Sequence, residues 1–299
     1  MRYESAERYT VCTFSDNGVP CVSVSGLDNF SVEKTLDCGQ CFRFMPVETD
    51  GGRYAVGGVA FGRYVEFVDS AGTLIIRNTD MQDFENIWKH YLALDMDYSD
   101  ITETLRSRVN TEVFDSALRV GKGIRILRQE PWECVCSFII SQTNNIPRIR
   151  KIISAMCEKY GDRIEFGSNT YYTFPDASRL KAAGADAIFS LRTGFRAKYI
   201  YDAACKAESG EINFDRLFEA DTEEALGELC RIKGVGPKVA SCALLFAFEK
   251  YDAFPVDVWV KKILAKYFPN GLDIAALGEY AGIAQQYLFY YERYIVSKR

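Results

Sequence analysis

Hydrophobic positions come in short runs over residues 8–79, and each run is rich in β-branched and aromatic residues. Gly, Asp and Asn separate the runs, which is the pattern of strands joined by turns. We therefore predict an antiparallel sheet for this part of the chain. The runs are RYTVCTF (8–14), VPCVSVSG (19–26), CFRFMPV (41–47), RYAVGGVAFGRYVEFVD (53–69) and GTLIIRNT (72–79).

From about residue 82 to the end, the hydrophobic positions recur with a helical period. We predict an α+β protein with a mainly antiparallel β domain over residues 1–124 and an all-helical domain over residues 125–299. Proline marks two predicted helix starts and glycine two predicted stops. These residues are Pro131, Pro147, Gly161 and Gly194.

Two of the predicted helices are joined by a Gly-Val-Gly turn at residues 234–236. Asp221 is placed to cap the first helix, with Glu224 at its third position, as in a capping box. Pro237 is typical of the first position of the second helix. The run VASCALLFAF (239–248) carries no charge, so we expect that helix to be buried on nearly all sides.

The Gly-Val-Gly turn and the lysine that follows it suggest phosphate binding or covalent chemistry. Glycine lets a backbone approach closely, and the N-terminus of a helix attracts anions. Lys238 becomes a nucleophile only when it is neutral; the helix dipole, apolar surroundings and the cations Lys233 and Arg231 would favour that form. From spacing alone, a phosphate-binding lysine is an equal alternative.

Asp257 lies 19 positions after Lys238, which is enough for a helix, a turn and a return to the same cleft. Its structural role is the N-cap of the helical run DVWVKKILAKYF. A carboxylate is also needed where a glycosidic bond breaks through a cationic sugar. The two residues are therefore candidates for one catalytic pair.

Charge and rare residue types narrow the function further. The net charge is −5, but residues 1–124 hold 12 basic and 19 acidic residues, whereas residues 125–299 hold 24 and 22. A phosphate-binding surface should therefore lie in the second half. His90 is the single histidine, which excludes histidine triads and histidine-rich metal sites. The ten cysteines are scattered, as buried reduced thiols would be.

No apolar run is long enough for a membrane span, and the N-terminus lacks the apolar core of a signal peptide. We therefore expect an intracellular protein, in the cytoplasm or nucleoid of a prokaryote or the nucleus of a eukaryote.

Five ordered segments resemble the 8-oxoguanine DNA glycosylase/AP lyases of the helix-hairpin-helix, Gly/Pro-Asp superfamily. The resemblance implies a TATA-binding-protein-like sheet domain and a helical glycosylase domain. It also implies excision of 8-oxoguanine opposite cytosine, with Lys238 forming a Schiff base and Asp257 stabilising the sugar cation. The segments are DCGQCFRF (37–44), QEPWECVCSFIISQTNNIPRI (129–149), TGFRAKYI (193–200), the hairpin with VDV (256–258), and AGIAQQYLF (281–289).

The same resemblance assigns four residues to the flipped base. The carbonyl of Gly39 would accept from N7–H, which exists in 8-oxoguanine and not in guanine. Gln285 would read the Watson–Crick edge. Phe289 and Cys242 would pack on the two faces of the base. As an alternative, Cys38 and Cys41 have CxxC spacing, but no second pair accompanies them.

Further residues are assigned to the DNA around the lesion. Two arginines would contact the unpaired cytosine, an aromatic side chain would be the wedge, and an Asn-rich loop and the hairpin glycines would approach the strands. Thr143 stands where the family has the asparagine that fills the vacated space. The assigned residues are Arg148, Arg196, Phe195, Asn144, Asn145, Gly234 and Gly236.

The resemblance also bears on ions and partners. Main-chain oxygens of Cys230, Ile232 and Val235 would coordinate a cation at the hairpin; no other cofactor is expected. An iron–sulfur cluster is excluded because no cysteine follows Cys242. The expected partner is double-stranded DNA containing oxidised guanine, bound by a monomer. The alternatives are a glycosylase for another damaged purine and a non-catalytic helix-hairpin-helix DNA-binding protein.

Overall fold

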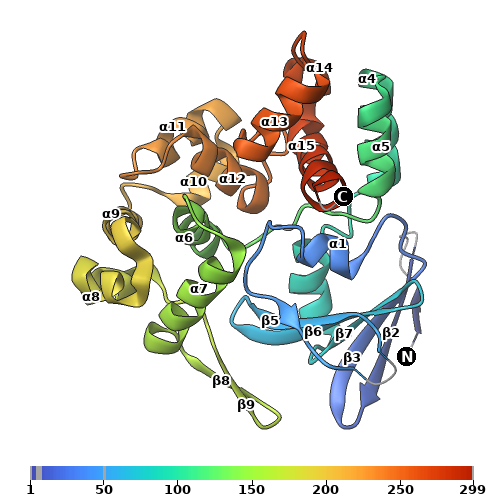
Figure 1. Cartoon of the computed structure of the whole chain (residues 1–299). Helices are drawn as coiled ribbons and strands as arrows, with labels where there is room; N and C mark the ends of the chain where they lie inside the picture. The colour runs from blue at the N-terminus through green and yellow to red at the C-terminus, as the bar shows by residue number, and fades with distance from the viewer. Residues whose placement is uncertain (1, 5–8, 50–51, 298–299) are drawn as a thin grey trace.

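The computed structural model describes residues 2–4, 9–49 and 52–297. An antiparallel sheet of seven strands forms the N-terminal part, and most of the remainder is helical (Figure 1). The strands lie in the order β1-β2-β3-β7-β6-β5-β4. Their bounds are β1 Arg2–Glu4, β2 Thr10–Asp16, β3 Val19–Ser25, β4 Met45–Pro46, β5 Ala55–Ala60, β6 Arg63–Ser70 and β7 Thr73–Arg77.

The α-helices are α1 Val32–Leu36, α2 Met81–Asp83, α3 Lys89–Tyr91, α4 Tyr98–Arg108, α5 Glu112–Val120, α6 Pro131–Ser141, α7 Ile146–Tyr160, α8 Ala177–Ile188, α9 Ala197–Glu208, α10 Phe214–Glu219, α11 Thr222–Cys230, α12 Pro237–Ala247, α13 Val258–Tyr267, α14 Ile274–Leu277 and α15 Ala281–Tyr290. Short π and 3-10 segments join several of them. In the described ranges, no helix is long and apolar enough to cross a membrane.

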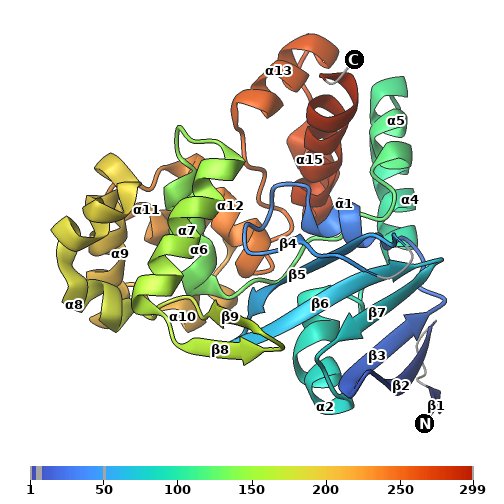
Figure 2. The same cartoon turned by 60° about the horizontal axis from the view of Figure 1, so that its bottom comes forward.

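The α+β class is confirmed, but the expectation of an all-helical second half is wrong. Strands β8 (Arg163–Phe166) and β9 (Asn169–Tyr172) form a hairpin that reaches from the helices to the sheet (Figure 2). Gly167, with φ 59°, supplies the left-handed turn residue between them. The ring of Tyr171 stacks on Tyr64 of β6, with 3.8 Å between the centroids. This contact with the sheet makes a short strand pair favourable.

Two of the predicted strands also differ in detail. The run 53–69 is two strands, because Phe61 and Gly62 both take positive φ and turn the chain. The run 41–47 contributes only the two residues of β4 to the sheet. Its first part leaves the sheet and enters the helical core instead, where Phe42 is buried.

The helix boundaries follow the local signals in the sequence. Pro131 opens α6, Pro147 stands in the first turn of α7, and Gly161 caps its end. Asp221 accepts a hydrogen bond from the N–H of Glu224 at 2.8 Å, so the predicted cap of α11 is confirmed. In α12, every residue after its first two is buried, as its uncharged sequence predicted.

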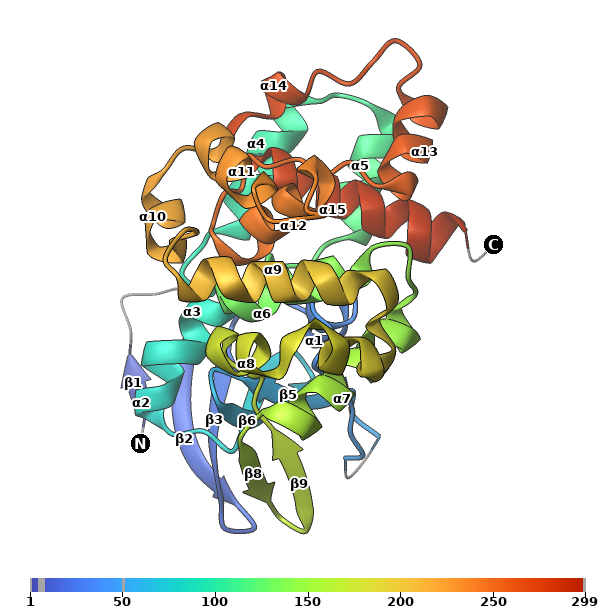
Figure 3. The same cartoon turned by 90° about the vertical axis from the view of Figure 1, so that its left-hand side faces the viewer.

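The molecule has two hydrophobic cores. One lies between the sheet, α1 and residues 84–94. The other unites α6, α7, α9, α12 and α15, and Figure 3 shows α8 and α9 packed side by side against this group. Buried residues of α4 and α5, among them Ile101 and Phe114, belong to this second core. The division predicted at residue 124 therefore does not coincide with the division between the cores.

The loop that contains Gly39 is held between the two cores by a fully buried glutamine. The amide of Gln40 donates to the carbonyls of Thr35 at 2.7 Å and Arg125 at 2.8 Å. Its Oε1 accepts from the N–H of Leu127 at 2.9 Å. Burial of so many polar groups is favourable only when all are paired. Gln40 thus fixes the loop against the connection that leads to α6.

We predict that Gln40→Leu lowers the free energy of unfolding by about 2–5 kcal/mol, because the carbonyl of Arg125 and the N–H of Leu127 lose the hydrogen bonds that Gln40 makes, and the carbonyl of Thr35 keeps only the weak thiol donor of Cys38. Urea denaturation measures this change. Gln82→Leu, an exposed substitution on α2, is the matched control and should shift stability by less than about 0.5 kcal/mol. Equal stabilities of the two variants would contradict the role of Gln40.

A buried ion pair joins the same segment to the helices. Arg43 Nη1 lies 3.4 Å from Glu133 Oε2 on α6, and Arg43 also donates to Tyr172 of the β8–β9 hairpin at 2.6 Å. Burial raises the pKa of Glu133 to about 7, although the guanidinium of Arg43 opposes the shift. Glu133 is thus an acid that the fold holds partly protonated near neutrality.

This raised pKa predicts a pH dependence of stability. Between the ordinary value of 4.5 and about 7, the folded protein holds a proton on Glu133 that the unfolded chain has lost. The free energy of unfolding should therefore fall as pH rises through this window, by up to about 1.4 kcal/mol per pH unit. Urea unfolding at several pH values should show this slope in the wild type and a smaller one in Glu133→Gln, where Glu130, whose pKa burial also raises, still contributes. The exposed control Glu158→Gln should keep the slope; a slope unchanged in Glu133→Gln would refute the assignment.

Candidate active site

A cavity of about 740 Å³ lies between the Gly39 loop and the helical core. Its walls come from α6, the loop after α6, and the starts of α12 and α13, with α15 closing one side. The predicted catalytic and base-binding residues all line this one space: Gly39, Lys238, Cys242, Asp257, Gln285 and Phe289. The structure therefore brings together the predicted catalytic pair and the predicted base-binding residues.

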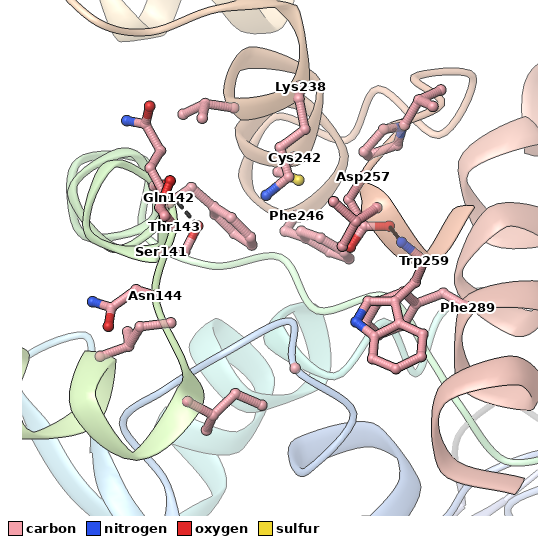
Figure 4. Close-up of a pocket in the computed structure, with 18 of the residues that line it drawn as sticks. Ser141, Gln142, Thr143, Asn144, Lys238, Cys242, Phe246, Asp257, Trp259 and Phe289 are labelled. Atoms are coloured by element: carbon pink, nitrogen blue, oxygen red, sulfur yellow. Dashed lines mark hydrogen bonds between the residues drawn. The ribbon is translucent and has the colours of Figure 1, made fainter. Parts of the chain in front are cut away.

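Lys238 enters the cavity from the first turn of α12. Figure 4 shows Lys238 and Cys242 on this helix, with Asp257 at the start of α13 beside them in the same pocket. The Nζ of Lys238 lies 5.6 Å from the ring centroid of Phe138. Burial raises the pKa of the Cys242 thiol, while the charge of Lys238 and a hydrogen bond from it oppose this shift. The amine thus lies in mainly apolar surroundings.

One of the influences expected on Lys238 is weaker than the sequence suggested. Arg231 pairs with Glu228 at 2.6 Å and with Glu211 at 3.1 Å. Two carboxylates therefore balance its charge. Arg231 is consequently not a source of unbalanced positive charge beside Lys238.

Asp257 is both a structural cap and a free carboxylate. Its Oδ1 accepts from the N–H groups of Trp259 at 2.9 Å and Val260 at 2.8 Å, which confirms the predicted N-cap of α13. Among the described residues, none donates a hydrogen bond to Oδ2. The helix start therefore orients the carboxylate at the cavity wall and leaves one oxygen for chemistry.

The other end of the cavity offers unused polar groups. Gln285 is buried, and its Oε1 has no hydrogen-bond partner in the described part of the chain. Gly39 has φ 88°, which favours glycine, and its carbonyl accepts no bond from the described residues. Phe289 and Trp259 line the same cavity and lie next to Asp257 in Figure 4. An orphaned acceptor in an apolar cavity is typical of a site built for a polar ligand.

The predicted hairpin glycines lie on the surface beside Phe195, the predicted wedge residue. Gly234 has φ 75°, and a Cβ there would lie 2.3 Å from the ring of Tyr199. Phe195, which is 52% exposed, contacts Tyr199 edge to face with 5.8 Å between centroids. Around Gly236, no atom lies within 4 Å of a Cβ position, so an approaching strand meets open backbone. The hairpin and Phe195 thus form one continuous surface.

The two predicted arginines occupy different environments. Arg196 is 3% exposed, and its guanidinium donates to the carbonyls of Gln142, Thr143 and Thr193. It therefore shapes the loop after α6, where Thr143 takes φ 49°. Arg148 is exposed and donates to the carbonyl of Arg192 at 3.3 Å. Only Arg148 is open to a ligand in this form of the protein.

The remaining loop residues also have structural roles. Asn145 caps α7 through the N–H of Arg148 at 3.0 Å, and Asn144 donates to the carbonyl of Ile140 at 3.0 Å. Both also line the cavity. Sequence reasoning missed Phe138, Trp259 and Arg293, which line it too. Phe138 and Trp259 lie in or beside recognised motifs, but aromatic residues at this spacing are typical of a hydrophobic core.

Known proteins resemble this chain in sequence and in fold. Residues 24–135 match the family model described as 8-oxoguanine DNA glycosylase, N-terminal domain. A solved structure of MBOgg1 in complex with a low affinity DNA ligand is 42% identical with a TM-score of 0.88, covering 96% of this chain and 99% of that one. The Clostridium acetobutylicum 8-oxoguanine glycosylase/lyase, in complex with DNA containing cytosine opposite 8-oxoguanine, is 36% identical with a TM-score of 0.85, covering 95% and 97%.

Among curated sequences, the N-glycosylase/DNA lyase of Arabidopsis thaliana is 35% identical over 199 residues, or 59% of this chain and 54% of the relative. The matched part thus spans about half of that relative's length. The two solved structures, in contrast, align over nearly their entire chains. The chain belongs to the 8-oxoguanine DNA glycosylase/lyase family of the helix-hairpin-helix superfamily.

Proposed function

We propose that this protein is a bifunctional DNA glycosylase/AP lyase that removes 8-oxoguanine from duplex DNA, with cytosine as the preferred opposite base. The observation that carries the proposal is one cavity in which an amine, a carboxylate and unused base-reading groups face a common space. A purine must leave the helical stack to enter such a space. The similar structures named 8-oxoguanine glycosylase/lyase support 8-oxoguanine as the substrate.

Discrimination would depend on the polar end of the cavity. The free carbonyl of Gly39 attracts the N7–H of 8-oxoguanine and repels the N7 lone pair of guanine. The orphaned Oε1 of Gln285 accepts from N1–H or N2–H of the base. Phe289 stacks on one face and Cys242 packs on the other. In this proposal the bound base would satisfy each of these groups.

The chemistry follows from the amine and the carboxylate. The Lys238 nitrogen bonds to C1′ as the glycosidic bond breaks, and the electron pair leaves with the base, which takes up a proton. Asp257 stabilises the positive charge on the sugar during this step. Ring opening gives an iminium, and loss of a proton from C2′ then expels the 3′ phosphate by β-elimination. Strand cleavage 3′ to the lesion is the product.

The surface outside the cavity would hold the duplex. Phe195 enters beside the opposite base, and Arg148 donates to the acceptors of the unpaired cytosine. Arg196 supports this region by holding the loop after α6. The backbone at Gly234 and Gly236 approaches a phosphate.

The hairpin carbonyls fit a cation in part. The Ile232 carbonyl accepts from the N–H of Val235 at 3.0 Å, whereas those of Cys230 and Val235 accept no bond from the described residues. Three carbonyls at one turn could coordinate a monovalent or divalent cation, which would supply positive charge beside the phosphate. No iron–sulfur cluster is part of the proposal, since no cysteine follows Cys242.

The partner in this proposal is double-stranded DNA containing oxidised guanine. Such a substrate implies action where the genome lies, in the nucleoid or the nucleus. One chain supplies every proposed catalytic and base-reading group, so a monomer suffices.

The nucleophile can be tested by trapping. We expect borohydride to link the wild type covalently to a duplex with 8-oxoguanine opposite cytosine, because it reduces the Schiff base. Lys238→Gln should give no adduct on denaturing gels. Lys181→Gln, an exposed change on α8, should trap as the wild type does. A wild type that binds this duplex but never forms an adduct would remove the lyase assignment and favour a non-catalytic module.

The carboxylate can be tested without disturbing the helix. Asparagine is also a good N-cap, so Asp257→Asn keeps the start of α13 and loses only the charge. We expect base release under single-turnover conditions to slow by about 10²–10⁴-fold while DNA affinity changes little. Asp252→Asn, which is exposed, should react at the wild-type rate. A comparable rate in Asp257→Asn would exclude a catalytic role for this residue.

A further inference from the structure

We propose that Arg293 is a base-recognition residue whose guanidinium donates a hydrogen bond to an exocyclic oxygen of the flipped oxidised guanine, next to N7. This inference rests on the proposed function and extends its substrate recognition. Arg293 follows α15 in the segment Tyr291–Val296 and lines the same cavity as Lys238 and Asp257.

Three aromatic rings hold the guanidinium of Arg293 at the base end of the cavity. Its central carbon lies 5.4 Å from the ring centroids of Phe289 and Tyr294, and 6.0 Å from that of Trp259. Flat contacts of this kind orient a guanidinium and leave its edge free to donate. Phe289 is the ring proposed to stack on the base. The guanidinium of Arg293 and the proposed base would therefore both contact Phe289.

The charge of Arg293 has no acidic partner among the described residues. Its neighbour Glu292 is turned to other groups, 2.8 Å from the hydroxyl of Tyr267 and 3.5 Å from Lys266. No hydrogen bond from the guanidinium to the described part of the chain occurs either. Arg293 is partly buried, so its donors are open to a ligand, and a ligand oxygen there would accept a charge-assisted hydrogen bond.

The position of Arg293 beside Gly39 selects the base as the source of that oxygen. Nη1 lies 3.8 Å from the position a Cβ on Gly39 would take. The Gly39 carbonyl is the proposed partner of N7–H, and on the purine N7 lies between the carbonyl at C6 and the one at C8. A donor next to this carbonyl therefore reaches a base oxygen. The hairpin, where a phosphate is expected, is on a different element: it leads into α12 at Pro237, whereas Arg293 follows α15.

The test compares two DNA substrates with Arg293→Met, which keeps an unbranched chain against the rings and loses every donor. On a duplex with 8-oxoguanine opposite cytosine, we expect base release at subsaturating enzyme to fall roughly 10- to 100-fold, the effect of losing one charge-assisted hydrogen bond. On a duplex with an abasic site opposite cytosine, strand cleavage should stay within roughly twofold, because no base remains to be held. The exposed control Arg119→Met should match the wild type on both substrates.

Each alternative outcome has a definite meaning. Equal losses on the lesion and abasic duplexes would show that Arg293 contacts a phosphate or supports the fold, and would overturn the inference. Unchanged rates on both would overturn it as well, while the proposed function stands. A wild type that cleaves neither duplex would instead refute the proposed function, and this inference with it. Cleavage of the abasic duplex by Arg293→Met also reports that the variant is folded.

Discussion

The placement of Gly39 depends on Gln40. A chain can present a bare carbonyl to a ligand only if its neighbouring polar groups are satisfied elsewhere, and Gln40 satisfies two carbonyls and one N–H at once. A second contact acts from the helical side, where the amide of Gln286 donates to the carbonyl of Cys38 at 3.4 Å. The loop is therefore fixed from both cores. Because Gln286 adjoins Gln285 on α15, the helix that supports the loop also carries the residue proposed to read the base.

Buried polar contacts also fix the two turns of the surface proposed to bind DNA. The buried guanidinium of Arg196 donates hydrogen bonds to the carbonyls of Gln142 and Thr143 in the loop after α6, and to that of Thr193. The loop carbonyls need such a donor because the chain has left the helix there. At the hairpin, Asp202 accepts from the N–H of Lys233 at 2.7 Å and from Lys206 at 3.0 Å. Charged side chains thus stiffen both turns from within. What faces outward is mainly backbone, Phe195 and Arg148, which suits contact with phosphates and an unpaired base.

Local signals in the sequence predicted most of the fold. Proline, glycine and capping aspartate define helix ends through interactions within a few residues, so α6, α7, α11 and α13 begin where expected. The β8–β9 hairpin was missed because its stability comes from Tyr64, about a hundred residues away. The assignment of α4 and α5 to the helical core was missed for the same reason. The period of hydrophobic positions shows which face of a helix is apolar, but it does not show against which core that face packs.

Sequence signals also predicted some residues of the candidate site and missed others. Lys238 and Asp257 could be paired from spacing, and the motif resemblance added Gly39, Gln285 and Phe289. Neither spacing nor motif pointed to Arg293, because an arginine near the end of an amphipathic segment is usually a solvent-exposed charge. Its significance appears only when Trp259, Phe289 and Tyr294 are seen around it and Glu292 is seen to face away. A charge that the fold surrounds with rings and leaves without a counter-ion points to a partner outside the chain.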